Sequence, residues 1–404
     1  GRLLWRHGGR TSDAGIIAEY NPFHNGHLYH IEKTRQAGAD YVVCVMSGNF
    51  VQRGECAFAD KWLRARAAVL GGADVVIDLP TPWSCASAET FARGSVGLLM
   101  NFGIDMLSFG CESDNKDLLI KSAGATENKE VSALIRSETA KGVSYPVAVQ
   151  RAVERVFGSE YGNALAEPNN TLAAEYIKQL MKYGREKDII PVRREGAAHD
   201  SSEAGGNIAS ASMIRNMGFE GGLDFMPSYI ADIFGGEAEK GFAPAMVAYS
   251  ERSILACLRS IKKEDYSLYV SDETGLASRI YEAAQTAGSL PDLYEKAKSR
   301  NYTMSRVRRE VMSIYLGVKK QWSEGIPPYM KILAVSEKGL SLLSKAKENS
   351  SVPIITKHSE AEKLTGKAKE IYDAECINTD LFMLMSKKTR ECALEKTHSL
   401  IIVK

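Results

Sequence analysis

The segment around His24 and His27 contains residue types and spacings that suit phosphate chemistry. A short apolar run, 15–20, precedes Pro22, and a helical pattern begins at Gly26. This order predicts a strand, a tight turn and a helix N-terminus, whose unpaired N–H groups and dipole favour an anion. Imidazole donors at that turn would stabilise the charge that develops on a phosphate during transfer. The segment therefore predicts nucleotidyl transfer, in which a nucleophile attacks an α-phosphate and pyrophosphate leaves.

These histidines have two simpler interpretations. Histidines in a loop are commonly surface residues, but the preceding strand, Pro22 and Gly26 favour a ligand-binding turn. A zinc site would use His24, His27 and His30, since His30 lies one helical turn beyond His27. Their spacing surrounds one metal less well than histidines at i and i+4 would, and no cysteine is near. We therefore expect phosphate contacts and no metal held by protein side chains.

Other candidates come directly after predicted strands or at helix starts. A glycine lets backbone approach a ribose or base, and two successive asparagines at a helix start leave one for a ligand after the other caps the helix. A guanidinium at a strand end matches phosphate oxygens, and either of two neighbouring arginines could supply it. These candidates are Gly110, Asn169, Asn170, Arg193 and Arg194.

A second phosphate cradle is predicted where another helix begins. Ser210, Ser212 and Arg215 combine two hydroxyls and a guanidinium at that start. The loop after the second predicted strand is also rich in glycine and polar residues, although an ordinary strand-to-helix loop is the alternative there. Charged groups expected to reach the same sheet edge from this loop are Arg53, Asp60 and Lys61.

These residues need a sheet that brings the ends of several strands together. The predicted strands are 15–20, 40–46, 74–79, 105–109 and 188–192, and the helices between the first four are 26–38, 60–70 and 88–100. Such alternation predicts an α/β fold, a Rossmann-like parallel sheet with helices on both faces. Ligands bind at the carboxyl edge of such a sheet, near the point where the strand order changes.

Changes in pattern divide the chain into regions. Residues 1–13 lack an apolar period and are expected to be a leader outside the fold. Residues 14–225 form the predicted nucleotidyltransferase-like domain, in which the polar stretch 196–207 is expected to cover the site. Residues 226–404 are expected to be mostly helical, with a small βαβ-like unit near 328–357.

Basic residues concentrate between 296 and 320, although the net charge of the whole chain is only +1. Apolar residues in this segment form a helix stripe, which leaves basic side chains on the other faces. Tyr294, Tyr302 and Trp322 add aromatic rings nearby. Such a combination suits single-stranded RNA, for example an anticodon loop, whereas a solvated helix face is the simpler alternative. The residues expected to bind RNA are Lys298, Arg306, Arg308 and Arg309.

Composition places the chain among ordinary globular proteins. It has 404 residues, of which 44% are hydrophobic and 25% charged, and no apolar run approaches the length of a membrane span. The seven cysteines form no C-x-x-C pair, and their odd number and scatter fit a reducing compartment. We expect a cytoplasmic protein with no membrane contact, and no protein partner is implied.

Several strings of residues together resemble one enzyme family. They are GIIAEYNPFHNGHLYHI, MSGNFVQRGE, DKWLRA, LSFGCE, PNNTLAAEYIK, RREGAAHD and IASASMIR. This combination is similar to the bacterial tRNA(Met) cytidine acetate ligases, which belong to the HIGH-motif nucleotidyltransferase superfamily. The resemblance is dense over residues 15–215 and looser in the helical half, at NYTMSRVRR and PPYMKIL.

The resemblance implies a reaction in two steps. ATP, with Mg²⁺, and acetate would give acetyl-adenylate and pyrophosphate; the wobble cytidine amine of elongator tRNA(Met) would then take the acetyl group and release AMP. His24 and His27 would act catalytically on the triphosphate. Arg194 is preferred to Arg193 because it stands two residues before Gly196, as in the family's pattern. The implied ATP-binding residues are Ile17, Ala18, Glu19, Tyr20, Asn21, Pro22, Phe23, His24, Asn25, Gly26, His27, Leu28, Tyr29, His30, Gly110, Asn169 and Arg194.

Some points stay open at the level of sequence. His199 and Asp200 are candidates for the base that the cytidine amine needs, although Ala198 replaces the tyrosine that the family usually has before them. A small-molecule adenylyltransferase would share the N-terminal half but would not need a basic C-terminal region. A non-catalytic tRNA-binding protein would not need to keep both motif histidines.

Overall fold

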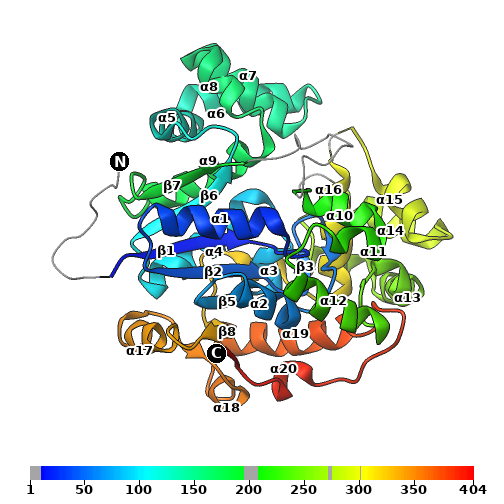
Figure 1. The fold of residues 1–404 in the computed structure, drawn as a ribbon. Helices are drawn as coiled ribbons and strands as arrows, with labels where there is room; N and C mark the ends of the chain where they lie inside the picture. Colours follow the sequence, from blue (N-terminus) through cyan, green and yellow to red (C-terminus); the bar gives the residue numbers. More distant parts are fainter. Residues whose placement is uncertain (1–10, 195–207, 272–274, 301) are drawn as a thin grey trace.

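A central sheet of eight strands organises the computed structural model, which describes residues 11–194, 208–271, 275–300 and 302–404 (Figure 1). Its strands are β1 (Asp13–Ala18), β2 (Tyr41–Ser47), β5 (Val75–Leu79), β6 (Met106–Cys111), β7 (Ile189–Arg193), β8 (Met330–Ser336), β9 (Ile354–Ile355) and β10 (Ile401–Val403). The strand order is β10-β8-β5-β2-β1-β6-β7, with β9 also paired to β8. All pairs are parallel except β5 with β8. Two short strands, β3 (Phe50–Val51) and β4 (Glu55–Cys56), form a separate antiparallel hairpin.

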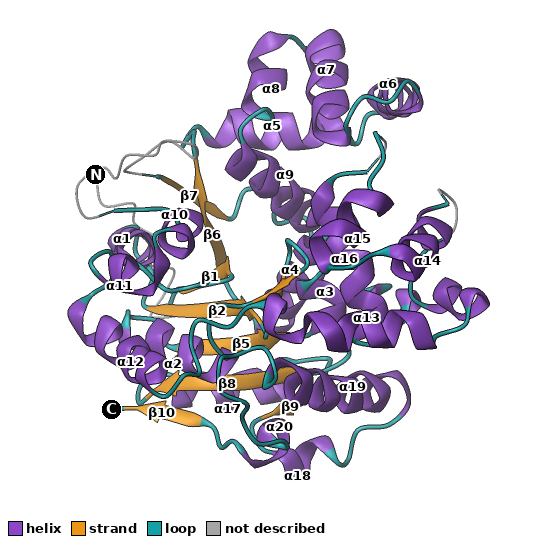
Figure 2. Ribbon diagram, turned by 90° about the vertical axis from the view of Figure 1, so that its right-hand side faces the viewer, coloured by secondary structure: helices purple, strands orange, loops and turns teal. Residues whose placement is uncertain are grey.

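The first helices cover both faces of this sheet, as predicted. They are α1 (Asn25–Gln36), α2 (Lys61–Leu70), α3 (Thr81–Ser84) and α4 (Ala88–Phe102). Helix α1 packs against β2, β6 and β7, and α2 packs against β5, β8 and β10. Helix α4 packs against β1 and β2 on the opposite face (Figure 2). In the strand order given above, β2 and β5 extend to one side of β1, and β6 and β7 extend to the other. The order therefore reverses between β1 and β6, and this is the switch point where such folds bind ligands.

Local sequence explains where these elements begin and end. The Asp60 carboxylate caps α2 by accepting the Leu63 N–H at 2.9 Å, and Gly71 follows the last helical residue. Gly103, with φ of 96°, ends α4 in the left-handed conformation. Strand β1 begins at Asp13, inside the segment expected to be a leader, and residues 1–10 lie outside the described residues.

The remaining helices surround the sheet on several sides. An insertion between β6 and β7 contains α5 (Lys116–Thr126), α6 (Lys129–Ala140), α7 (Tyr145–Phe157), α8 (Ser159–Ala164) and α9 (Pro168–Met181), of which α9 packs on α4 and β6. Next come α10 (Ala211–Asn216), α11 (Gly218–Leu223), α12 (Ser228–Glu239), α13 (Glu251–Ser260), α14 (Leu276–Thr286), α15 (Leu290–Ala297) and α16 (Met304–Tyr315). The last are α17 (Leu340–Asn349), α18 (His358–Ala361), α19 (Gly366–Phe382) and α20 (Leu394–Thr397), and three short 3-10 helices lie at Val247–Ser250, Lys263–Leu268 and Lys320–Ser323. No helix within these described ranges is long and apolar enough to cross a membrane.

The βαβ unit expected near residues 328–357 forms as β8, α17 and β9, but it is not a separate unit. Strand β8 pairs with β5 and β10, so it extends the sheet of the N-terminal half. The expectation of helix beyond the unit missed β10, whose three residues follow α20. The boundary expected near residue 225 is therefore not a boundary of the sheet.

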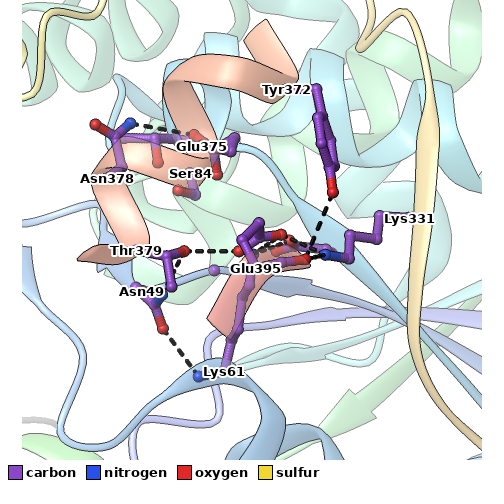
Figure 3. Close-up of polar contacts among 12 residues, drawn as sticks. Asn49, Lys61, Ser84, Lys331, Tyr372, Glu375, Asn378, Thr379 and Glu395 are labelled. Carbon is purple, nitrogen blue, oxygen red and sulfur yellow. Dashed lines mark hydrogen bonds and ion pairs between the residues drawn. The ribbon is translucent and has the colours of Figure 1, made fainter. Parts of the chain in front are cut away.

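A buried charge cluster joins the C-terminal elements to α2 and β5 (Figure 3). It consists of Lys61, Asp78, Lys331, Glu375 and Glu395, each at most 6% exposed. The Lys61 ammonium lies 2.5 Å from the Asp78 carboxylate and 2.9 Å from the Glu395 carboxylate. Lys331 lies 2.5 Å from Glu395. Burial would raise the pKa of Glu395, but the two lysines outweigh it and hold that pKa at about 2.

The third carboxyl of the cluster, Glu375, has no lysine left to neutralise it. Burial and the neighbouring Asp78 and Glu395 raise its pKa to about 7, although Lys61 opposes the shift. Its Oε1 accepts the Thr81 N–H at 3.0 Å, which a glutamine carbonyl would also accept. The neutral acid is thus the form that the fold favours.

Replacing Glu375 with glutamine is expected to stabilise the protein increasingly as the pH rises. In the unfolded chain a glutamate ionises near its usual pKa, whereas in the fold Glu375 stays protonated up to about pH 7. The wild type therefore loses stability between these two values, and Glu375→Gln does not. The shift corresponds to about 3 kcal/mol. Urea unfolding at pH 5 and pH 8 checks this, and a difference between the two proteins that does not change with pH would contradict it.

Candidate active site

A cavity of about 290 Å³ opens where β1 and β6 end, at the switch point of the sheet. Phe109 and Gly110 contribute from β6, and Gln52 contributes from the loop between β3 and β4. Of the residues that the family resemblance implies for ATP, the cavity is lined by Ile17, Ala18, Glu19, Tyr20, Asn21, His24, Gly26, His27, Tyr29, His30, Gly110, Asn169 and Arg194. Pro22, Phe23, Asn25 and Leu28 belong to the same segment but do not line it.

Two arginines hold the turn between β1 and α1 in place. Arg64, which is fully buried in α2, donates to the main-chain carbonyls of Glu19 at 2.5 Å and Ser47 at 3.1 Å. It therefore joins the carboxyl ends of β1 and β2. Arg215 donates to the carbonyl of Asn21 at 2.6 Å from the other side. Charge-assisted bonds of this kind fix the turn before any ligand arrives.

The turn also contains a strained residue. Tyr20 has φ of 44°, in the left-handed region that side chains other than glycine rarely adopt. Its hydroxyl lies 3.4 Å from the Cys44 sulfur, and its ring meets the His27 ring edge-on at 4.8 Å. Phe23 packs on His27 from another direction at 5.5 Å. Strain held by such packing is typical of functional turns, and here it places the His27 ring.

His24 and His27 cap α1 with their own side chains. The Nδ1 of His24 accepts the Gly26 N–H at 3.0 Å, and the Nδ1 of His27 accepts the His24 N–H at 3.2 Å. Because each Nδ1 is an acceptor, each neutral ring carries its proton on Nε2. The two rings stack with centroids 3.7 Å apart. The turn therefore offers two adjacent Nε2–H donors.

Both imidazoles are neutral. Burial lowers the pKa of His24 to about 3, and the guanidinium groups of Arg194 and Arg215 act in the same direction. Burial also lowers the pKa of His27 well below its usual value, with His24, Arg194 and His30 contributing. The positive surroundings that disfavour imidazolium are those that favour a polyanion.

Gly26 is required by the His24 ring itself. A Cβ at this position would lie 2.9 Å from the Cε1 of His24, closer than real contacts allow. Close approach of a ligand is one reason for a glycine here, and the second reason is that a larger residue would displace the His24 imidazole.

His30 is anchored on β6 instead of capping the helix. Its Nε2 lies 2.9 Å from the Ser108 hydroxyl, which lies 2.7 Å from the Thr34 hydroxyl. Because Thr34 donates its proton to the His30 carbonyl, Ser108 donates to Thr34 and accepts from the His30 Nε2–H. His30 therefore fixes α1 to the sheet and presents its other face to the cavity.

A second cluster forms on the far side of the cavity around Glu112. Its carboxylate accepts the Asn169 side-chain N–H at 2.5 Å and the Asn170 backbone N–H at 3.0 Å. Arg194 donates to the Asn169 side-chain oxygen at 3.0 Å. The expected cap was wrong, because α9 begins at Pro168 and both asparagines instead hold Glu112. Glu112 lies within the family string LSFGCE, but nothing in its local pattern singled it out.

Two of the other charged candidates, Lys61 and Asp60, have structural partners. The Lys61 side chain ends in the buried charge cluster, and Asp60 pairs with Arg390 at 2.7 Å. Contrary to the expectation, neither side chain reaches the cavity. Arg53 is exposed. Lys61 and Asp60 have partners in parts of the chain that are remote in sequence, such as Glu395 and Arg390. Local sequence patterns do not reveal such contacts.

The helix start at residue 210 forms as predicted, with a different use of its side chains. The Ser210 hydroxyl accepts the Met213 N–H at 3.2 Å and caps α10. Arg215 donates to the Ser212 hydroxyl at 3.2 Å as well as to the turn. None of the three lines the cavity, so their contact with phosphate stays a prediction. The loop at 196–207, with His199 and Asp200, lies outside the described residues.

The basic residues expected to bind RNA divide into two groups. Arg308 pairs with Glu55 at 2.8 Å, and Arg309 donates to the Gln52 carbonyl at 3.1 Å, so both dock α16 on the β3–β4 hairpin. A Cβ at Gly54 would overlap the backbone of these two arginines, so only glycine allows this contact. In the second group, Arg306 lies over the Tyr302 ring at 5.2 Å, and Lys298 is exposed.

Charge reversal is expected to separate these groups. Arg306→Glu should weaken RNA binding roughly tenfold, equivalent to about 1.4 kcal/mol, and reduce its salt dependence, with ATP chemistry retained. Arg308→Glu should impair both, because it places like charges against Glu55 and loosens the hairpin beside the cavity. Filter binding and nucleotide turnover check this. Recovery of the second variant by Glu55→Arg is the matched control, and equal effects of both reversals would contradict the division.

No group of three metal-ligating side chains occurs in the part of the chain that the structure describes. The polar groups that line the cavity include the two Nε2–H groups, the Asn169 amide and the Arg194 guanidinium. Such a set can bind a polyphosphate and stabilise charge that develops on it.

Comparison with known proteins gives the same picture. Residues 12–397 match the HIGH Nucleotidyl Transferase family. Proteins described as tRNA(Met) cytidine acetate ligase from Thermoanaerobacter sp. (strain X514) and Acetivibrio thermocellus are each 35% identical, covering 96% of this chain and 98% and 99% of their own lengths. The crystal structure of Thermotoga maritima TmcAL bound with alpha-thio ATP is 29% identical, with a TM-score of 0.87 over 97% of this chain and 100% of that one. The apo form of the same protein gives 0.89.

Proposed function

The chain belongs to the HIGH nucleotidyl transferase family, and from this premise we propose that it is a tRNA(Met) cytidine acetate ligase. The observation that carries the proposal is the pair of stacked imidazoles at the N-terminus of α1, with both Nε2–H groups available at a cavity that also holds Arg194. The curated relatives bear the name of this activity over nearly their whole length. The enzyme joins acetate to the wobble cytidine of elongator tRNA(Met) at the expense of ATP.

In the first step an acetate oxygen attacks the α-phosphorus of ATP. A P–O bond forms while the bond to the β-phosphate oxygen breaks, and pyrophosphate leaves with the electron pair. His24 and His27 donate to triphosphate oxygens, and Arg194 neutralises the departing pyrophosphate. Acetate is anionic at neutral pH and needs no base, so positioning and charge stabilisation supply the catalysis.

ATP would bind together with Mg²⁺. Mg²⁺ usually keeps several waters and takes substrate phosphate oxygens with one or two carboxylates, so it does not require a cage of protein ligands. The donors that line the cavity suit the phosphate oxygens of such a complex. The ion would supply positive charge that stabilises the charge developing on the phosphates.

In the second step the cytidine amine attacks the acetyl carbon of acetyl-adenylate, and AMP leaves. The wobble base must leave its stack to reach the cavity. Residues 226–404 would provide most of the tRNA contacts, with Lys298 and Arg306 among them, whereas Arg308 and Arg309 support the hairpin. A role on tRNA and seven free thiols suit the cytoplasm.

The direct test is mass spectrometry of tRNA(Met) incubated with protein, ATP and isotopically labelled acetate. The expected product is a labelled acetylcytidine at the wobble position that requires both ATP and acetate. Acetyl-CoA in place of acetate serves as the control and should give no product. Pyrophosphate exchange into ATP that does not depend on acetate would instead support an adenylyltransferase for another small molecule.

A further inference from the structure

The two sides of the cavity differ in chemistry. On the α1 side lie His24 and His27, which suit phosphate. On the α4 and α9 side the lining includes Phe91, Leu172 and Tyr176. Apolar and aromatic walls of this kind suit a flat heteroaromatic ring with little charge. A base therefore fits against α4 and α9, either the adenine of ATP or the acceptor base, with the nucleotide phosphates against α1.

Glu19 is the one acidic side chain among the described residues that line the cavity. A carboxylate repels a triphosphate, so its presence in such a cavity calls for a role toward another group. It cannot serve acetate, which is itself an anion. A neutral amine that must lose a proton is the reacting group to which a carboxylate is suited.

The structure holds this carboxylate firmly. The Gln52 N–H donates to the Glu19 Oε1 at 3.0 Å, while Arg64 donates to the Glu19 main-chain carbonyl at 2.5 Å. Gln52 is in turn fixed by Arg309 of α16, which donates to its carbonyl at 3.1 Å. Contacts from α2, through Arg64, and from α16, through Arg309 and Gln52, therefore position Glu19. Its Oε1 accepts the Gln52 N–H, and its Oε2 can accept a proton.

The histidines are poorly suited to the same task. In His24 and His27 each Nδ1 accepts a backbone N–H, and each Nε2 carries a proton, so neither ring has a nitrogen left to accept another. His30 donates its Nε2–H to Ser108, and this contact anchors the ring on β6.

On the basis of the proposed function, we propose that Glu19 is the catalytic base of the acetyl-transfer step. The cytidine N4 forms a bond to the acetyl carbon, the bond from that carbon to the AMP phosphate oxygen breaks, and AMP leaves with the electron pair. The proton that N4 loses passes to the Oε2 of Glu19. Because the base serves only the second step, formation of acetyl-adenylate does not need it.

The test compares the two half-reactions in Glu19→Gln, which keeps an oxygen for the Gln52 N–H. Acetate-dependent pyrophosphate exchange should change only a few-fold, whereas single-turnover acetyl transfer to tRNA(Met) should fall about 10²-fold or more. The KM for tRNA should stay near that of the wild type. Glu19→Asp should recover part of the transfer rate, since it restores a carboxylate.

Each outcome has one meaning. Exchange without transfer in Glu19→Gln supports the base. Normal transfer by this variant overturns the inference and leaves the proposed function standing, and equal loss of both half-reactions assigns Glu19 to the nucleotide instead. Loss of transfer in Asp200→Asn with Glu19→Gln unaffected would move the base to that residue. A wild-type protein that lacks acetate-dependent exchange would overturn the proposed function itself.

Discussion

Replacing His27 with asparagine is expected to reduce acetate-dependent pyrophosphate exchange by about 10²–10³-fold while leaving the fold intact. The Asn side-chain oxygen can take the place of Nδ1 and accept the His24 N–H, which keeps the cap of α1. What disappears is the Nε2–H donor, whose contact with the triphosphate strengthens as pyrophosphate departs. A donor of that kind contributes mainly to kcat.

His27→Ala provides the comparison. It removes the donor and the capping acceptor together, so it should show the same loss of exchange and in addition about 1 kcal/mol of lost stability. Thermal unfolding and exchange assays on the two variants separate these effects. Wild-type exchange in the asparagine variant would remove His27 from the chemistry.

The neutral state of the imidazoles predicts a particular pH profile. The pKa of His24 in the free enzyme is lowered to about 3. The kcat/KM of exchange should therefore not change above pH 6 through titration of an imidazole. This follows because both Nε2–H donors are already present at every pH in that range.

Replacing Lys61 with methionine is expected to cost about 3–5 kcal/mol of stability, the effect of removing one partner from a buried ion pair. Lys61 lies between Asp78 and Glu395, and its loss strands the Asp78 carboxylate in the core. Lys331 can still neutralise Glu395. The elements that depend on the contact are α2, β5 and α20.

Urea or thermal unfolding measures this effect, and two further variants interpret it. Lys61→Met with Asp78→Asn should regain part of the stability, since the stranded charge is gone. Lys296→Met breaks an exposed pair with Asp292 at 2.9 Å and should change stability little. Equal, small losses at Lys61 and Lys296 would show that burial does not strengthen the cluster.

The sequence was sufficient to predict the parts of the fold that depend on local order. Strand, turn and helix alternate with clear caps, as at Asp60 and Gly71, so the first four central strands and the position of the histidine turn were predictable. That topology predicts the switch point. It also predicts that Gly110, Asn169 and Arg194 lie together, and all three line one cavity.

What could not be predicted depends on contacts between distant parts of the chain. A basic helix has the same sequence pattern whether its arginines face solvent or the β3–β4 hairpin. The contact of Arg308 with Glu55 could therefore not be predicted from the sequence. Arg64 is a charged residue in an amphipathic helix, and only the fold shows that it is buried beneath main-chain carbonyls. Strand β10 is too short to give a pattern, and β8 looked like part of a separate unit because pairing partners leave no local signal.

The position of β8 between β5 and β10 sets the order in which this protein can assemble. Val75 pairs with Val335, so a nascent chain emerging from the ribosome carries the complete histidine turn long before β5 has its second neighbour. Until then β5 is an unpaired apolar edge of the kind that chaperones shield. An enzyme that works on the machinery of translation therefore extends its own sheet past β5 only after Val335 has been synthesised.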